Sequence, residues 1–337
     1  MKKNSWLVGL LTTLFFVGTA QAYTRQEVVQ RGLLKCGVST GSPGFSSVDA
    51  LGRWTGLDVD ICRAVAAATL GDAEKVEFLP LAENESFTAL LSGEVDILSR
   101  HSTWTFTRES ALAVHFAGVS YYDGQGFLVS TRLNVDRLPD LRKVKVCSPV
   151  DSAFEPNLID YFQRNKIEYN VVAYDSLDLA IKGFKSGACD LISMQQSQLY
   201  GLRLSLADPD SAVVLPVVIA KAPLGPVVRQ DDDTWLNIVK WSLYAMINGE
   251  ELGVTSANID EMRTSNVLAV KRLFGLAGAG GKSLGLRDDW AVQIIRQVGN
   301  YGEVFERNLG SRSAMGIERG LNNLWNRGGL QYAPPLQ

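Results

Sequence analysis

The sequence has few of the residues that bind transition metals. It has only two histidines, His101 and His115, and no closely spaced pair among its four cysteines. Structural zinc sites take cysteine and histidine ligands at short spacings, so no metal site is expected. The zinc-protease pattern H-E-x-x-H is missing, and neither histidine has an evident nucleophile as partner. These absences argue against an enzyme and give no reason to expect a cofactor.

Patterns typical of nucleotide and nucleic-acid binding are also missing. The run GLAGAGGKS, residues 275–283, resembles a phosphate loop but has Leu276 where that pattern needs glycine. The chain has 33 basic against 36 acidic residues and no basic patch interleaved with aromatic residues. Nucleic acid is therefore not expected as a partner.

Long apolar runs are confined to the N-terminus. Two lysines precede an apolar region over residues 6–17, and Ala20-Gln21-Ala22 supplies the small residues of a cleavage site. We expect residues 1–22 to be a signal peptide, cleaved after Ala22, that exports the chain to the periplasm. The alternative, a membrane anchor, is disfavoured because the run is short and no later stretch reaches the roughly 18 apolar residues of a spanning helix.

The cysteine content fits an exported protein. Four cysteines in an oxidising compartment predict two disulfides, which can pair in three ways. We favour Cys36–Cys62 and Cys147–Cys189, because each pair closes a loop inside one of two candidate lobes. The length of 337 residues also suggests two lobes rather than one core.

Strand-like and helix-like segments alternate twice along the chain, which predicts βαβ units and mostly parallel sheets. SGEVDIL at 92–98 and SGACDLI at 186–192 share S-G-x-x-D followed by two apolar residues, each after a predicted helix. The match places Ser99 and Ser193 just beyond the carboxyl ends of equivalent strands, where open α/β sheets bind ligands. The predicted strands are 33–39, 75–81, 95–98, 144–147, 169–174 and 190–192, and the predicted helices 57–69, 86–91, 153–164, 177–185, 234–247, 259–274, 290–301 and 317–325.

The stretch SRHSTWTFTRES, residues 99–110, combines hydroxyl side chains with an arginine directly after an apolar strand. The guanidinium of Arg108 suits a carboxylate, and Ser102 and Thr103 can donate to the same group. The alternative is a surface arginine beside hydroxyls that cap a helix. We expect a ligand carboxylate to bind here.

In each predicted lobe a loop follows the first predicted strand. The loop at 39–64 is rich in glycine and serine, and its Phe45 is either a wall of the ligand site or a core residue. Asp58 and Asp60 are better explained as N-terminal residues of a helix than as a metal pair. In the loop at 147–157, Ser152 and Glu155 fit a capping box, which is compatible with a ligand contact.

Several longer stretches resemble the extracytoplasmic solute-binding proteins of bacterial ABC importers, in the branch of general L-amino-acid-binding proteins. They include GRWTGLDVDICRAVAAA, YYDGQGFLV, WSLYAMINGEELGVTSAN and GLNNLWNRGGLQYAPP. The resemblance implies a periplasmic-binding-protein-like fold of two α/β lobes with a two-crossing hinge (type II), plus a helical C-terminal extension. It also implies a monomer that closes on an amino acid and docks on an inner-membrane ABC permease. The expected segments are 23–129 for lobe 1, 130–219 for lobe 2, and 220–337 for the return to lobe 1 and the extension.

Carried over by position, the resemblance assigns Arg108 and Thr103 to the clamp on the ligand carboxylate. It assigns the loop from Ser39 to Ser46 to the first-lobe ligand loop, and Ser152 to the second-lobe contact.

The second lobe departs from the family pattern. Gln195 stands where the family usually has the aspartate that pairs with the ligand ammonium group, and Ala153 and Ser86 also replace usual residues. Asp151 is a possible substitute for the lost carboxylate, and it is also the one candidate acid or base for a lyase on this fold. The ligand is therefore an amino acid bound with altered geometry or a carboxylate without an ammonium group. The remaining alternative is a sensory or partner-docking protein on the same scaffold.

Overall fold

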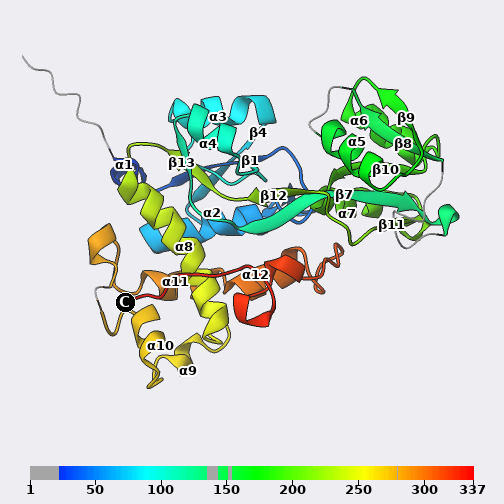
Figure 1. Cartoon of the computed structure of the whole chain (residues 1–337). Helices are drawn as coiled ribbons and strands as arrows, with labels where there is room; N and C mark the ends of the chain where they lie inside the picture. The colour runs from blue at the N-terminus through cyan, green and yellow to red at the C-terminus, as the bar shows by residue number, and fades with distance from the viewer. Residues whose placement is uncertain (1–22, 135–142, 151–153, 279) are drawn as a thin grey trace, which may run out of the picture.

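The structure is a computed structural model that describes residues 23–134, 143–150, 154–278 and 280–337. Two α/β lobes lie side by side, and a helical C-terminal region packs under the first of them (Figure 1). The fold is the predicted one, mixed α/β in two lobes with C-terminal helices. The predicted signal peptide, residues 1–22, lies outside the described residues.

The first lobe is built on a five-stranded sheet in the order β4-β1-β5-β13-β6. Strands β4 and β5 run parallel to β1, and β13 runs antiparallel to β5 and β6. Its elements are α1 (Thr24–Arg31), β1 (Leu34–Ser39), β2 (Ser47–Val48), β3 (Trp54–Thr55), α2 (Leu57–Leu70), β4 (Val76–Leu81), α3 (Glu83–Leu91), β5 (Ile97–Leu98), α4 (Phe106–Ala111), β6 (Val114–Phe116) and β13 (Val227–Arg229).

The second lobe has a six-stranded sheet in the order β11-β7-β10-β8-β9, with β12 paired to β7. Strands β9 and β10 run parallel to β8, and β7 runs antiparallel to β10. Its elements are β7 (Tyr121–Ser130), η1 (Thr131–Leu133), β8 (Val144–Pro149), α5 (Glu155–Arg164), β9 (Tyr169–Tyr174), α6 (Leu177–Lys185), β10 (Leu191–Gln195), α7 (Gln196–Leu204), η3 (Pro209–Ser211), β11 (Ala212–Val214) and β12 (Ala220–Leu224).

The repeated S-G-x-x-D motif makes the same turn in both lobes. Gly93 and Gly187 have φ values of 80° and 77°, which favour glycine. Each aspartate then bonds to the neighbouring parallel strand, β1 or β8: Asp96 Oδ2 accepts from Lys35 N at 2.7 Å, and Asp190 Oδ2 accepts from Lys145 N at 2.8 Å. The motif therefore fixes the order of two neighbouring strands in each lobe.

Strands β7 and β12 form the two crossings between the lobes. Their antiparallel pairing runs from Tyr121 opposite Leu224 to Gln125 opposite Ala220. Tyr121 is buried in the core of the first lobe, whereas Phe127 is buried in the second. One continuous strand thus begins in one core and ends in the other.

The C-terminal region braces the first of these crossings. Asn322 Oδ1 accepts from Tyr122 N at 2.6 Å, and Asn322 Nδ2 donates to Tyr122 O at 3.1 Å. Tyr301 Oη also donates to Ser120 O at 2.8 Å. The region comprises α8 (Asp233–Glu251), α9 (Ile259–Met262), α10 (Leu268–Leu273), η4 (Lys282–Leu284), α11 (Trp290–Gln297), α12 (Tyr301–Asn308), η5 (Gly320–Asn322) and η6 (Trp325–Arg327).

Three helix predictions in this region were wrong. The predicted helix 259–274 splits into α9 and α10, because Thr264 and Ser265 bond to the local backbone through their hydroxyls. The predicted helix 290–301 ends early, and an Asn300–Glu303 capping box starts α12. The predicted helix 317–325 contains only the short turn η5, since Gly320 has φ 46°.

Two disulfides are present, Cys36–Cys62 and Cys147–Cys189, and they are the pairs that the sequence analysis favours. Each joins a strand to an element in the same lobe. The first ties β1 to α2, and the second ties β8 to the turn before β10.

Candidate functional site

Residues 99–103 leave the carboxyl end of β5 and face the second lobe. Ser99 Oγ donates to Asp58 Oδ1 at 3.3 Å, which ties the start of the loop to the first turn of α2. Gly225 N donates to Ser102 O at 3.2 Å, and Thr103 forms a β-bridge with Leu224. The loop is therefore anchored both to the first lobe and to the second crossing, β12.

Arg108 lies in the first turn of α4, where Thr105 Oγ1 accepts from its backbone N–H at 3.2 Å. Its guanidinium donates through Nη1 to Thr103 O at 3.1 Å and through Nη2 to Glu83 Oε1 at 2.7 Å. It also lies over the ring of Phe87, with Cζ at 5.6 Å from the centroid. Arg108 is thus held against the loop, and one of its terminal nitrogens is bonded to a carboxylate of the protein itself, that of Glu83.

Two of the predicted site residues contact each other across the lobes. Gln195 ends β10, and its Nε2 donates to Thr103 Oγ1 at 3.0 Å. An amide can donate to a hydroxyl in this way, whereas a carboxylate only accepts. The residue that departs from the family pattern therefore bonds to the residue that the resemblance assigns to the carboxylate clamp.

A second bridge between the lobes involves a residue that the sequence analysis did not select. His101 Nε2 lies 3.0 Å from Ser197 Oγ, and the same hydroxyl donates to Asp123 Oδ2 at 2.5 Å. His101 has φ 64°, which is uncommon for a residue other than glycine. Asp123 lies on β7, so the bridge joins the loop, the second lobe and the first crossing. The sequence signal for it was a histidine in a chain that has only two.

The loop after β1 is held by its own hydroxyls. Ser39 Oγ and Ser46 Oγ lie 2.6 Å apart, and Ser39 N donates to Ser46 Oγ at 3.2 Å. Residues 37–41, Gly-Val-Ser-Thr-Gly, match the letters of the hydrolase pattern G-x-S-x-G. The central serine, however, bonds to another serine, while the nearby His101 bonds elsewhere.

Phe45, predicted as either a ligand wall or a core residue, is a core residue in this structure. It is 1% exposed, and its ring centroid lies 4.2 Å from that of His101 and 5.2 Å from that of Tyr121. Its carbonyl accepts from Asp58 N at 3.0 Å, so the loop occupies the N-terminus of α2. A Cβ at Gly56 would lie 2.1 Å from that carbonyl, which explains the glycine before the helix.

The two acidic side chains in the first turn of α2 bond to other parts of the protein. Burial raises the pKa of Asp58 to about 6, against the opposing effects of the His101 charge and the Ser99 hydrogen bond. Asp60 Oδ2 accepts instead from Arg307 and Asn308, at 2.8 and 2.7 Å. Within the described ranges no group of three or more potential metal ligands is found.

Arg100 is a second arginine in the loop, and the sequence analysis passed over it. Its side chain is half-buried, and its Nε is buried without a hydrogen-bond partner. Burial lowers its pKa, with the nearby Arg108 charge acting in the same direction and Glu83 and Asp58 opposing it. Ser102 Oγ is likewise buried without a partner.

Asp151 and Ser152, predicted to contact the ligand from the second lobe, lie outside the described residues. The predicted capping box Ser152–Glu155 includes Ser152 and therefore also lies outside the described residues. The helix starts at Glu155, with Phe154 at the N-cap position and no side-chain cap. The start is held from β7, because Gln125 Nε2 donates to Phe154 O at 2.9 Å.

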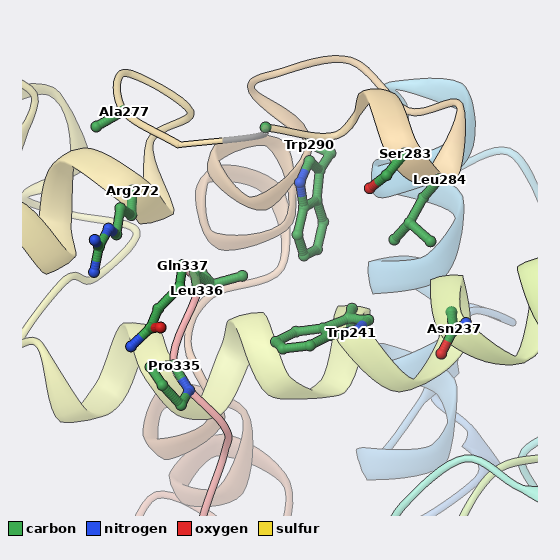
Figure 2. A pocket seen from close by; sticks show the side chains of 11 residues that line it. Asn237, Trp241, Arg272, Ala277, Ser283, Leu284, Trp290, Pro335, Leu336 and Gln337 are labelled. Atoms are coloured by element: carbon green, nitrogen blue, oxygen red, sulfur yellow. The ribbon is translucent and has the colours of Figure 1, made fainter.

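Three cavities lie along α8 and the C-terminal segment, and one of them also borders the site stretch through Trp104 and Glu109. One of about 490 Å³ is bordered by Trp241 of α8, Trp290 of α11 and Arg272 of α10 (Figure 2). The glycine-rich run that resembles a phosphate loop contributes Gly280 and Ser283 to its wall. No helix in the described part of the chain is long and apolar enough to cross a membrane.

Comparisons with known proteins agree with this architecture. The family described as bacterial extracellular solute-binding proteins, family 3, matches residues 34–257. The general L-amino acid-binding periplasmic protein AapJ of Rhizobium johnstonii is 47% identical over 338 residues, covering 100% of this chain and 99% of that protein.

Two further relatives are similar over nearly the whole chain. The glutamate/glutamine/aspartate/asparagine-binding protein BztA of Rhodobacter capsulatus is 44% identical over 338 residues, covering 100% of both chains. A solved structure of an ABC transporter periplasmic binding protein from Brucella ovis, with glutathione bound, is 48% identical with a TM-score of 0.86. It covers 94% of this chain and 100% of that one.

Proposed function

The chain belongs to the bacterial extracellular solute-binding proteins, family 3, a family of binding proteins rather than enzymes, and we propose that it captures an amino acid or a closely related carboxylate for an ABC importer. It does so in the periplasm, after removal of residues 1–22. The observation that carries the proposal is similarity along the full length to relatives named for amino-acid binding.

The arrangement of the first lobe supports a carboxylate contact at Arg108. Its guanidinium is held in place by the carbonyl of Thr103 and the ring of Phe87. The one carboxylate on its fork, that of Glu83, is 70% exposed and can move into solvent. A ligand carboxylate would then take the place of Glu83 and keep a charge-assisted bond.

The hinge supports a mechanism of lobe closure. Only β7 and β12 cross between the lobes, within the residues that the structure describes, and the contacts Thr103–Gln195 and His101–Ser197 join the lobes next to these two strands. A ligand between the lobes would exchange these direct bonds for bonds through itself, as in other hinge closures.

The substituted residue Gln195 favours a ligand that does not depend on an ammonium contact there. Replacing a carboxylate by an amide removes a charge-assisted bond worth about 1.5–3 kcal/mol, or roughly 10- to 150-fold in affinity. Asp123, the acidic residue of the hinge, already accepts from Ser197 and from Gly124 N. A carboxylate without an ammonium group is therefore the second candidate ligand.

Calorimetry on the full exported protein, stripped of any ligand that co-purifies, tests the proposal against a panel of L-amino acids and 2-oxo acids. Arg108→Ala should abolish binding of the carboxylate ligand while leaving the unfolding temperature of the empty protein nearly unchanged. The matched control is Arg164→Ala, since Arg164 is 77% exposed and pairs only with Asp160 on its own helix. Binding that survives in Arg108→Ala would show that the clamp is misassigned.

The variant Gln195→Asp separates the two candidate ligands. If the site binds α-amino acids but lacks a partner for their ammonium group, Gln195→Asp should bind them roughly 10-fold or more tightly than the wild type does. An unchanged amino-acid affinity, with tight binding of a 2-oxo acid, would favour the non-amino carboxylate. A well-folded protein that binds no member of the panel would leave the sensory or partner-docking alternative.

A further inference from the structure

The loop at residues 99–103 carries one cation that no described residue neutralises directly. Arg100 is flanked by Ser99 and His101, whose side chains contact Asp58 and Ser197. These two contacts hold the loop on both sides of Arg100, so Arg100 lies where the two lobes meet. Its half-buried guanidinium has an Nε with no hydrogen-bond partner. An unpaired buried donor on a charged group is costly unless something else satisfies it.

Arg100 lies among charges of both signs. Burial has the largest effect and lowers its pKa, the Glu83 and Asp58 charges raise it, and the Arg108 charge, the smallest of these effects, lowers it. The acidic group that they share at the surface is Glu83, which bonds to Arg108 and is 70% exposed. Asp58 also acts on Arg100, but it is buried behind the loop under Ser99 and is itself destabilised in its charged form.

The opposite side of the site lacks a free carboxylate among the described residues. Gln195 is neutral and donates to Thr103. Asp123 is buried, and its two oxygens accept from Ser197 and Gly124 N. Among the described residues, the second lobe therefore gives a cationic group no accessible partner next to the loop that carries the two arginines.

We infer that Arg100 is a second cationic ligand contact beside Arg108, and that the site selects ligands of net negative charge over neutral zwitterions. The inference rests on the proposed function, since it concerns the same ligand site. It fits an acidic amino acid, which has two carboxylates and one ammonium group, and equally an acid without the ammonium group. Their common property is that the carboxylates outnumber the cationic groups, so that the ligand has a net negative charge.

The test compares L-glutamate, L-glutamine and 2-oxoglutarate by calorimetry on the full exported protein. Glutamate and glutamine have nearly the same shape and differ in net charge. We expect glutamate to bind at least about 10-fold more tightly than glutamine, the size of one charge-assisted bond. Arg100→Gln should remove that preference by weakening glutamate, with glutamine affinity changed by less than about threefold.

Three further variants make the result specific. Arg100→Lys keeps the charge and should keep most of the preference, which guards against a folding defect in Arg100→Gln. Glu83→Gln removes the competing surface carboxylate and should strengthen glutamate binding by roughly two- to fivefold. Arg164→Gln, on the exposed face of α5, should change nothing.

The possible failures are distinguishable. Equal affinities for glutamate and glutamine would overturn the inference and leave the proposed function standing. The same holds if Arg100→Gln weakens both ligands equally, because Arg100 would then be structural. Absence of binding for all three compounds would overturn the inference together with the proposed function for ligands of this size and shape.

Discussion

The buried carboxyl of Asp58 should make the protein less stable as the pH rises. Asp58 is 3% exposed, and its Oδ2 is buried without a hydrogen-bond partner. Burial raises its pKa from 3.8 to about 6 in the folded protein. The folded state therefore holds the proton more tightly than the unfolded state, so stability is highest below the unfolded pKa and is lost as the pH rises through the folded pKa.

The size of the effect follows from the shift. A rise from 3.8 to about 6 corresponds to about 3 kcal/mol in total, of which about 2 kcal/mol develops between about pH 4.5 and pH 8. The variant Asp58→Asn keeps the shape and cannot ionise. Its free energy of unfolding, minus that of the wild type, should therefore increase by about 2 kcal/mol over that range.

Urea unfolding at a series of pH values measures this difference, with tryptophan fluorescence and far-UV circular dichroism as two probes whose agreement tests for a single transition. Other titrating groups affect both proteins and cancel in the difference. Asp49→Asn is the control: hydrogen bonds from the Arg53 backbone and side chain lower the pKa of Asp49, so its difference should be nearly flat over that range and of opposite sign only below about pH 4. A difference for Asp58→Asn that is flat or falls with pH would refute the reasoning.

Two further predictions concern the C-terminal region. Arg319→Met should destabilise the protein by about 1–3 kcal/mol in urea unfolding, because buried Glu250 loses the partner 3.0 Å away and keeps Arg327, at 3.7 Å. Adding Glu250→Gln should recover part of the loss, and no recovery would contradict the pairing. Asn322→Ala removes both hydrogen bonds to the Tyr122 backbone and should cost about 1–3 kcal/mol. It should also speed amide hydrogen exchange at the start of β7, and unchanged exchange there would show that the C-terminal region does not brace the hinge.

The fold was predictable from the sequence where local chemistry dictates it. The S-G-x-x-D repeat needs a glycine with positive φ and an aspartate that bonds to the neighbouring strand, so the same letters give the same turn in both lobes. Helix ends in the C-terminal region were harder to predict. The apolar spacing there runs on through local interruptions: the hydroxyls of Thr264 and Ser265 bond to the backbone between α9 and α10, and the capping box of Asn300 starts α12.

The sequence analysis selected Arg108, whose contact with a ligand stays a prediction, and passed over its neighbours in the same loop. Arg108 stands out because an arginine and several hydroxyls follow an apolar strand. Arg100 and His101 are in the same stretch, but their importance depends on what lies across the cleft, and Ser197 is 96 residues from His101. A sequence motif records only one side of such a contact.

The substitution at Gln195 illustrates why the chemistry of a site has to be judged on both lobes together. Taken alone, the change from aspartate to glutamine removes a partner for an ammonium group. In the structure the amide nitrogen of Gln195 also donates to the hydroxyl oxygen of Thr103, which adds a bond between the lobes. A carboxylate has no hydrogen to donate and could not make this bond. With Arg100 and Arg108 on the facing loop, the same change shifts the charge of the site towards positive. The substitution thus changes a contact that holds the lobes together, and under the proposed function it would also change the ligand charge that the site favours.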